Sequence, residues 1–285
     1  MQEVILDTVV DAVKLLPFLF LTYLVMEYME HRMGEKTKET IRKSGRFGPV
    51  LGGVFGVFPQ CGFSAAASNL FAGRVITLGT LIAIFLSTSD EMLPILISEQ
   101  VHISVILKIL GLKMLIGIAA GFLIDLFIRK KDTHVHEHME IEHMCEHEHC
   151  HCEDGIFKSA FRHTLNIFLF ILLISFVMNT VIFYLGEDFL ANLLLNKPVF
   201  GQMIAGLVGL IPNCAASVII TQLYLEGVMG LGSMMAGLLA GTGVGLLVLF
   251  KVNDDWKENV KILALLYGIG VVAGILIDVS GFTIG

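Results

Sequence analysis

Apolar stretches of about 20 residues recur along nearly the whole chain, and this recurrence limits the folds that the sequence can adopt. Such a stretch crosses a bilayer as one helix, because a helix rises about 1.5 Å per residue and the hydrocarbon core is about 30 Å thick. Hydrophobic residues make up 55% of the 285 residues and charged residues only 16%. The sequence predicts an all-α polytopic membrane protein with about 8–10 membrane segments, and it excludes a soluble enzyme with one compact core.

Charge and cysteine content exclude two further classes of protein. The net charge is -7 and the basic residues lie in short loops, which argues against nucleic-acid binding. Three of the five cysteines crowd into one His-rich segment, which argues against a disulfide scaffold. The start, Met1-Gln2-Glu3, lacks the positive region of a secretory signal, so we expect the first apolar segment to be retained.

The chain reads as two copies of one design at an offset of about 153 residues. The clearest match aligns Pro59-Gln60-Cys61-Gly62 with Pro212-Asn213-Cys214-Ala215. Each half contains a long apolar helix, an apolar stretch broken by Pro and Gly, and two further helices. The expected ranges are 8–30, 48–73, 75–98 and 104–128, matched by 161–185, 201–226, 229–250 and 261–280. We interpret 1–132 and 157–285 as two membrane repeats, a common plan in secondary transporters, joined by a linker at 133–156.

Charge placement indicates that the two halves have opposite orientations in the membrane. The loop at 31–46 carries six Lys and Arg residues, whereas its counterpart at 186–198 carries only Lys197 beside two acidic residues. Because basic loops stay on the cytoplasmic side, this contrast suggests inverted repeats. Inversion needs an odd number of crossings per half, so each Pro-broken helix is either a re-entrant hairpin or a pair of short spans. The alternative is a parallel repeat of plain spans.

The inverted map makes the chain an integral protein of the cell membrane with its N-terminus outside. Residues 31–46, 129–162 and 251–261 are then cytoplasmic, together with Arg74, and they hold 15 of the 19 Lys and Arg residues. The lysines that remain for the outer side are Lys14, Lys108, Lys113 and Lys197.

Both breaks carry an amide and a thiol directly after the proline. Broken backbone at membrane depth is tolerated where protein or water satisfies it, so we expect both breaks to face a cavity near the midplane. The candidate path residues here are Gln60, Cys61, Asn213 and Cys214. The alternative is a packing kink with buried cysteines.

Polar residues follow each break at helical spacing. Ser64 and Ser68 share one helix face, and Ser217 and Thr221 repeat the pattern. This strip either lines a pore or joins neighbouring helices through hydrogen bonds.

Asp90 and Glu91 lie within the otherwise apolar range 75–98, where one charge costs about 2.5–3.5 kcal/mol on insertion scales. The second half has a Gly-rich segment at 240–245 in this place and no acid. We therefore interpret the two carboxylates as an asymmetric functional site. The alternative is a half-solvated helix end.

The central segment at 134–152 holds seven of the ten histidines and three of the five cysteines. Its candidate metal ligands are His134, His136, His138, His143, Cys145, His147, His149, Cys150, His151 and Cys152. Imidazole and thiolate bind zinc, copper, nickel or cobalt, but the spacing is not that of a zinc finger. We expect a cytoplasmic metal-binding linker that holds several ions; the alternative is a low-complexity tether.

On these features the chain resembles the ten-helix heavy-metal exporters, a family also labelled manganese transporters or arsenic efflux proteins. The resemblance rests on the twin breaks, on the Ser-Thr-Ser-Asp-Glu-Met-Leu-Pro segment at 87–94 and on the His-rich centre, and it covers essentially the full chain. It implies ten helices, so each Pro break would count as two short spans.

The favoured function is a secondary transporter that exports a divalent transition metal, such as manganese or zinc, from the cytosol by proton exchange. Carboxylates of Asp90 and Glu91, amides of Gln60 and Asn213, and thiols of Cys61 and Cys214 would bind the ion. No GxxxxGK[ST] sequence is present, which argues against ATP drive. The expected partners are the metal ion and the lipid bilayer, with no further cofactor and no nucleic acid.

Two other functions use the same cysteines. The first is efflux of arsenicals or of another thiol-seeking or anionic solute, which half-helix N-termini at the breaks would attract. The second is an intramembrane thiol redox enzyme. Neither Cys61 nor Cys214 belongs to a CxxC motif, so we expect a transporter and not an enzyme.

Overall fold

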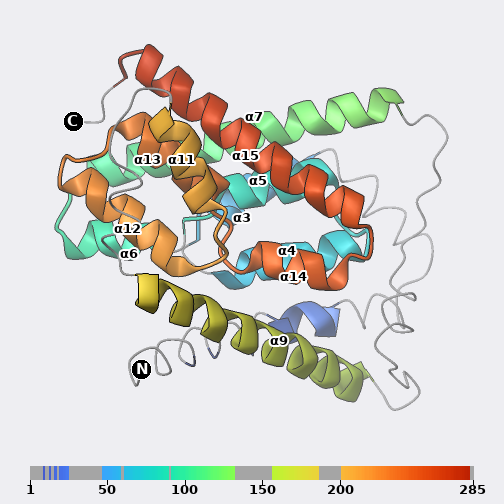
Figure 1. Cartoon of the computed structure of the whole chain (residues 1–285). Helices are drawn as coiled ribbons and strands as arrows, with labels where there is room; N and C mark the ends of the chain where they lie inside the picture. The colour runs from blue at the N-terminus through green and yellow to red at the C-terminus, as the bar shows by residue number, and fades with distance from the viewer. Residues whose placement is uncertain are drawn as a thin grey trace.

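The computed structural model describes residues 9, 13, 16–17, 19–25, 47–58, 61–89, 91–131, 156–185 and 200–282, and the statements below refer to these residues. They form helices joined by short turns, with no strand among them (Figure 1). In chain order the helices are α3 (Gly48–Gly56), α4 (Cys61–Ala72), α5 (Leu78–Ser87), α6 (Met92–Ser98), α7 (Ile103–Lys131), α9 (Ile156–Leu185), α11 (Phe200–Gly209), α12 (Cys214–Leu225), α13 (Leu231–Ala240), α14 (Gly245–Val252) and α15 (Trp256–Val279).

Five stretches of the described chain are long and apolar enough to cross a bilayer. They are Leu78–Ser98, Ile103–Phe127, Ala160–Val177, Leu231–Val252 and Trp256–Val279, with mean hydropathy between 1.6 and 2.4. The expected all-helical membrane class is therefore confirmed. The inverted arrangement of the halves stays a prediction.

Helix contacts in the first half recur in the second half at the spacing found in the sequence. The backbone N–H of Gly79, at the start of α5, donates to Oδ1 of Asp125 on α7 at 2.9 Å. The N–H of Gly232, at the start of α13, donates to Oδ1 of Asp278 on α15 at the same distance. The first N–H groups of a helix lack intrahelical partners, and a carboxylate satisfies them and complements the helix dipole. Asp125 and Asp278 therefore tie the start of one helix to the far end of another.

Glycine allows these helix pairs to touch through their backbones. A Cβ atom on Gly121 would lie inside van der Waals contact of the carbonyl oxygen of Gly79, and one on Gly274 would meet the carbonyl oxygen of Gly232 in the same way. Small residues permit such close approach in membrane proteins, where helix association depends on packing and not on a hydrophobic driving force. The pairs α5/α7 and α13/α15 are thus held in register by the same device.

The structure corrects the expectation of one helix over 75–98 and one over 229–250. The first is interrupted between Ser87 and Met92, and the second between Ala240 and Gly245. The hydroxyl of Thr88 donates back to the carbonyl oxygen of Ile84 at 2.8 Å, which offers the backbone an alternative to continued helix.

Glycine makes the second interruption. Gly241 has extended backbone with ψ 113°. Gly243 has φ 54°, in the left-handed region that glycine adopts without strain. Each half therefore contains two breaks, where the sequence predicted one.

The two halves interlock through their short helices. α4 of the first half packs along α14 of the second, α12 packs on α6, and α5 contacts α13 (Figure 1). α9 lies against α14 and against residues 19–25, where the rings of Tyr23 and His163 stack at 5.3 Å. The buried core thus lies between the breaks of both halves.

Adding a methyl group at the glycine contacts tests this packing. We expect Gly121→Ala and Gly274→Ala each to destabilise the protein by about 1–3 kcal/mol, the usual cost of overpacking. The matched controls are Gly111→Ala on α7 and Gly268→Ala on α15, where an added Cβ meets nothing within 4 Å. The controls should leave stability unchanged or raise it by up to about 1 kcal/mol, because alanine favours helix. Thermal unfolding of the purified protein in detergent measures all four, and equal midpoints for the two pairs would contradict the assignment.

Candidate functional site

The thiols of Cys61 and Cys214 meet between the two halves of the chain. Their Sγ atoms lie 3.6 Å apart, although 153 residues separate them in the sequence. Each cysteine is the first residue of its helix, α4 and α12, and each is half-buried and not disulfide-bonded. The structure therefore brings together two of the residues that the sequence proposed for a transport path.

The turn before α12 is built by Asn213. Its backbone is extended, with φ -147° and ψ 143°, and its side-chain oxygen accepts a hydrogen bond from the N–H of Ala215 at 3.0 Å. Asn213 thus caps α12 and fixes the position of the Cys214 thiol next to it. Gln60, the matching amide of the first half, lies outside the described residues.

Both thiols lie at the positive end of a helix dipole, because α4 and α12 begin at Cys61 and Cys214. Helix N-termini stabilise negative charge and point free N–H groups outward. The two helix N-termini thus favour negative charge at this place, as an anionic solute would bring it.

The serines after Cys61 join helices. Ser68 is fully buried, and its hydroxyl lies 3.0 Å from the carbonyl oxygen of Ser64 and 2.7 Å from that of Gly245 on α14. Ser64 donates to the carbonyl oxygen of Cys61 at 2.8 Å. These contacts are those of interhelical hydrogen bonding, one of the two roles that the sequence left open.

The matching residues on α12 differ in burial, because Thr221 is buried like Ser68 whereas Ser217 is more exposed than Ser64. Thr221 is fully buried and donates to the carbonyl oxygen of Ser217 at 2.7 Å. Ser217 is half-buried. The hydroxyl oxygen of Ser217 lies 3.7 Å from the position that a Cβ atom on Gly241 would occupy. Ser217 therefore lies beside the break between α13 and α14.

The second break of the first half contains the acidic residues. Glu91 occupies the N-cap position of α6 and is half-buried. The interpretation that it lies within a helix is therefore wrong, since the helix ends at Ser87 and restarts at Met92. Asp90 lies outside the described residues.

Each Pro break ends against the second break of its own half. A Cβ on Gly56, the last residue of α3, would collide with the hydroxyl of Ser87, and one on Gly209 would collide with the carbonyl oxygen of Gly237. α14 packs on α4. A Cβ atom added to Gly245 would lie only 2.7 Å from the Cβ atom of Ser64. These contacts gather the breaks of both halves into one region.

Three buried polar atoms of the described chain have no hydrogen-bond partner: Asn69 Nδ2, Gln202 Oε1 and Thr242 Oγ1. Of these residues, Thr242 lies in the break between α13 and α14, and it is 1% exposed. Buried hydroxyls without protein partners are normally satisfied by water or an ion, so Thr242 is a further candidate for the path. The signal in the sequence is its position in a Gly-Thr-Gly run within an apolar segment.

Lys113 is buried, a feature that the charge count does not predict when it leaves this residue for the outer side. Its side chain is 1% exposed on α7 and is among the largest fully buried side chains of the described residues. Its ammonium donates to the carbonyl oxygen of Thr88, and to that of Leu238 at 3.0 Å. The available signal was a lone cation inside an apolar stretch, which by default marks a functional position in a membrane segment.

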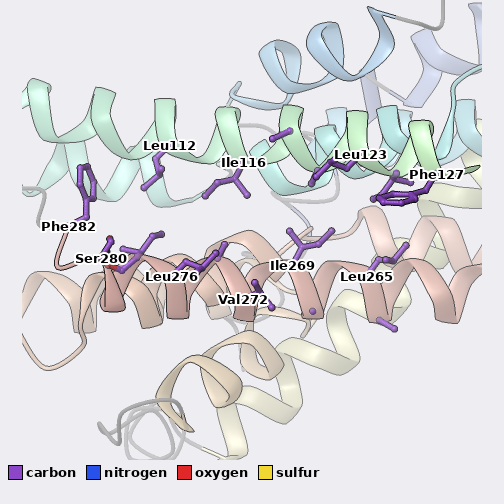
Figure 2. Close-up of a pocket in the computed structure, with 17 residues that line it drawn as sticks. Leu112, Ile116, Leu123, Phe127, Leu265, Ile269, Val272, Leu276, Ser280 and Phe282 are labelled. Atoms are coloured by element: carbon purple, nitrogen blue, oxygen red, sulfur yellow. Dashed lines mark hydrogen bonds between the residues drawn. The ribbon is translucent and has the colours of Figure 1, made fainter.

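The described residues contain no group of three or more His, Cys, Asp or Glu side chains that could hold a metal ion. The His- and Cys-rich segment lies outside them, so its ligand set stays a prediction. A groove of about 790 Å³ does run between α7 and α15 (Figure 2). Ser280 is the one polar side chain that lines it, so it offers no set of ligands for an ion.

Comparison with known proteins places the chain in a family. Residues 1–198 match the family model ArsP_2, described as "Putative, 10TM heavy-metal exporter". No curated protein and no solved structure matches the chain. The match covers more than half of the chain, and the five apolar helices agree with a membrane transporter. The chain is an integral membrane protein and belongs to this family of ten-helix heavy-metal exporters.

Proposed function

We propose that the chain exports a thiophilic divalent metal ion, with zinc as the best fit, from the cytosol through the region where the breaks meet. The observation that carries this proposal is the distance of 3.6 Å between Cys61 Sγ and Cys214 Sγ. Two thiolates on one tetrahedral zinc, each about 2.3 Å from the ion, lie about 3.8 Å apart. The pair could therefore bind such an ion with little movement of either helix.

The thiol pair also ranks the metals that the sequence left open. Thiolates select zinc and softer ions, whereas manganese prefers sites made of oxygen ligands. A manganese exporter would have to bind its ion mainly through Asp90 and Glu91. In our proposal these carboxylates and the amide of Gln60 complete the coordination of an ion that the two thiols hold.

The repeated contacts of the two halves support an internal repeat, and we propose that the repeats are inverted and work by alternating access. In such transporters, substrates bind where broken helices of both repeats meet. Protons compete with metal ions for thiolates and carboxylates, so proton exchange could drive export. The His- and Cys-rich segment would collect ions on the cytosolic side, and this expected location, together with the family, is the ground on which we propose export.

A second candidate substrate is a trivalent arsenical. It would use the same pair of thiols, and the helix N-termini at Cys61 and Cys214 favour a solute with negative charge. A thiol redox enzyme would use the pair differently, because its turnover requires a disulfide between these two sulfurs.

Replacing the two cysteines tests the metal site. We expect Cys61→Ser and Cys214→Ser each to reduce zinc flux at low zinc at least about tenfold, which corresponds to about 1.4 kcal/mol. The assay is uptake into proteoliposomes of zinc, cadmium, manganese or trivalent arsenicals, with and without a pH gradient. Met203→Leu, which removes a sulfur from the exposed face of α11, is the control and should leave flux intact.

Three outcomes of this assay would change the assignment. Manganese flux that survives in the double variant, with zinc inert, would move the site to the carboxylates. Arsenical flux that requires both thiols, with all divalent ions inert, would establish the second candidate. Flux that is absent for every solute, together with reversible Cys61–Cys214 disulfide formation, would favour the redox enzyme.

The carboxylates at the second break are expected to be essential for flux. Asp90→Asn combined with Glu91→Gln should abolish transport while leaving expression and chromatographic behaviour intact, since it removes both anionic oxygens. Glu99→Gln, at the exposed end of α6, is the control and should transport normally. Normal flux in the double variant would remove these residues from the path.

The central segment is expected to supply ions and not to form the path. Deletion of 134–152 should retain transport, but the flux should fall more steeply than that of the full chain when zinc is scarce. Flux as a function of free zinc concentration measures this difference. A deletion protein that no longer folds would show the segment to be structural.

A further inference from the structure

The ammonium of Lys113 is held at the ends of two broken helices from different halves of the chain. Thr88, whose carbonyl oxygen accepts one hydrogen bond, is the C-cap of α5. Leu238, whose carbonyl oxygen accepts the other at 3.0 Å, lies in the last turn of α13. The last four carbonyl groups of a helix lack intrahelical partners, and the helix dipole makes this end negative. The side chain thus fills a carbonyl-lined position that suits a cation.

Packing alone does not require a lysine at this position. The residue 153 positions later is Leu266 on α15, which is 0% exposed. The repeated fold therefore accommodates an aliphatic side chain at the equivalent place. Lys113 introduces a buried charge that its counterpart lacks.

The acidic residues show the same asymmetry. Asp90 and Glu91 align with Gly243 and Val244, so both signs of charge occur in the first half and neither occurs at these positions in the second. Thr88, which binds the ammonium, precedes Glu91 by three residues in the same break. The ammonium is thus held in the break that contains Glu91, and a cation in such a place offsets part of the charge of a carboxylate.

The described helices around Lys113 carry few other ionisable groups. Among them, α3, α5, α6 and α13 have no ionisable side chain. On α7 itself the nearest ones in sequence are Lys108, which is exposed, and Asp125, which is bound to Gly79 and to the hydroxyl of Thr77. Within the described part of the chain, Lys113 and Glu91 are therefore the charged residues assigned to this break.

We propose that Lys113 sets the affinity of the transport site: its positive charge lowers the net negative charge of the break, so that a divalent ion binds weakly enough to be released. This inference rests on the proposed export of a metal ion. A transport site has to bind its ion well enough to load it and loosely enough to let it leave. Without the ammonium the site would carry one more net negative charge, bind a divalent cation more tightly and release it more slowly.

The test compares neutral and charged variants of one side chain. Lys113→Met keeps the length and removes the charge, and Lys113→Gln can still donate to the carbonyl oxygens. Both should bind zinc about tenfold or more tightly than the unaltered protein and transport it more slowly per bound ion. Lys113→Arg keeps the charge and should bind zinc most like the unaltered protein. Lys108→Leu on the same helix is the matched control and should change neither quantity.

Zinc titration of the full chain in lipid nanodiscs gives the Kd, and uptake into proteoliposomes gives the turnover. A purely structural role for Lys113 predicts weaker binding or loss of fold in the neutral variants, so tighter binding separates the two roles. Folded neutral variants with an unchanged or weaker Kd would overturn the inference, as would the failure of both neutral variants to fold. Absence of zinc binding and flux in the unaltered protein would instead overturn the proposed function, and the inference with it.

Discussion

Backbone groups that lose their helical partners inside a bilayer have to find new ones within the protein, since hydrocarbon offers none. The helices of this chain are interrupted repeatedly. Side chains of the protein bind the backbone N–H and carbonyl groups that are left at the helix ends. Asp125 and Asp278 bind the N–H groups at the starts of α5 and α13. Asn213 caps α12, and Lys113 binds carbonyl groups at the ends of α5 and α13. The contact between the thiols depends on this arrangement, because both cysteines begin helices that follow a break.

The scaffold and the site differ in how closely they follow the repeat. The glycine contacts and the aspartate caps recur in both halves, and they hold helices together without regard to substrate. The charged residues Lys113, Asp90 and Glu91 have apolar or glycine counterparts. The cysteines follow the repeat, since each half contributes one of them. The two thiols then form a single contact between the halves. A repeated frame thus carries an asymmetric distribution of charge.

The sequence predicts that both Pro-Xaa-Cys breaks face a cavity near the midplane, and the contact between their two thiols is a finding of the structure. The sequence does not predict the interruptions at Ser87 and Ala240. A polar run at 87–91 and a Gly-Thr-Gly run at 241–243 lie at these places, but the interruptions depend on local hydrogen bonds and on the backbone of Gly243, which only a three-dimensional structure shows. Counting charges by loops does not reveal the burial of Lys113, because it cannot distinguish a solvated lysine from one bound to helix ends. Asp90, Gln60 and the His- and Cys-rich segment lie outside the described residues, so their roles rest on sequence and on the experiments above.

The contacts of Gly79 with Gly121 and of Gly232 with Gly274 have a mechanical consequence. Helices whose backbones touch at glycine cannot slide along each other, because a shift of one residue would bring a side chain into the contact. α5 and α7 are therefore locked in register, and α13 and α15 likewise. A change in the shape of this region has to bend the chain elsewhere. The helices are already interrupted after Ser87 and after Ala240, so bending at these two points breaks no continuous helix.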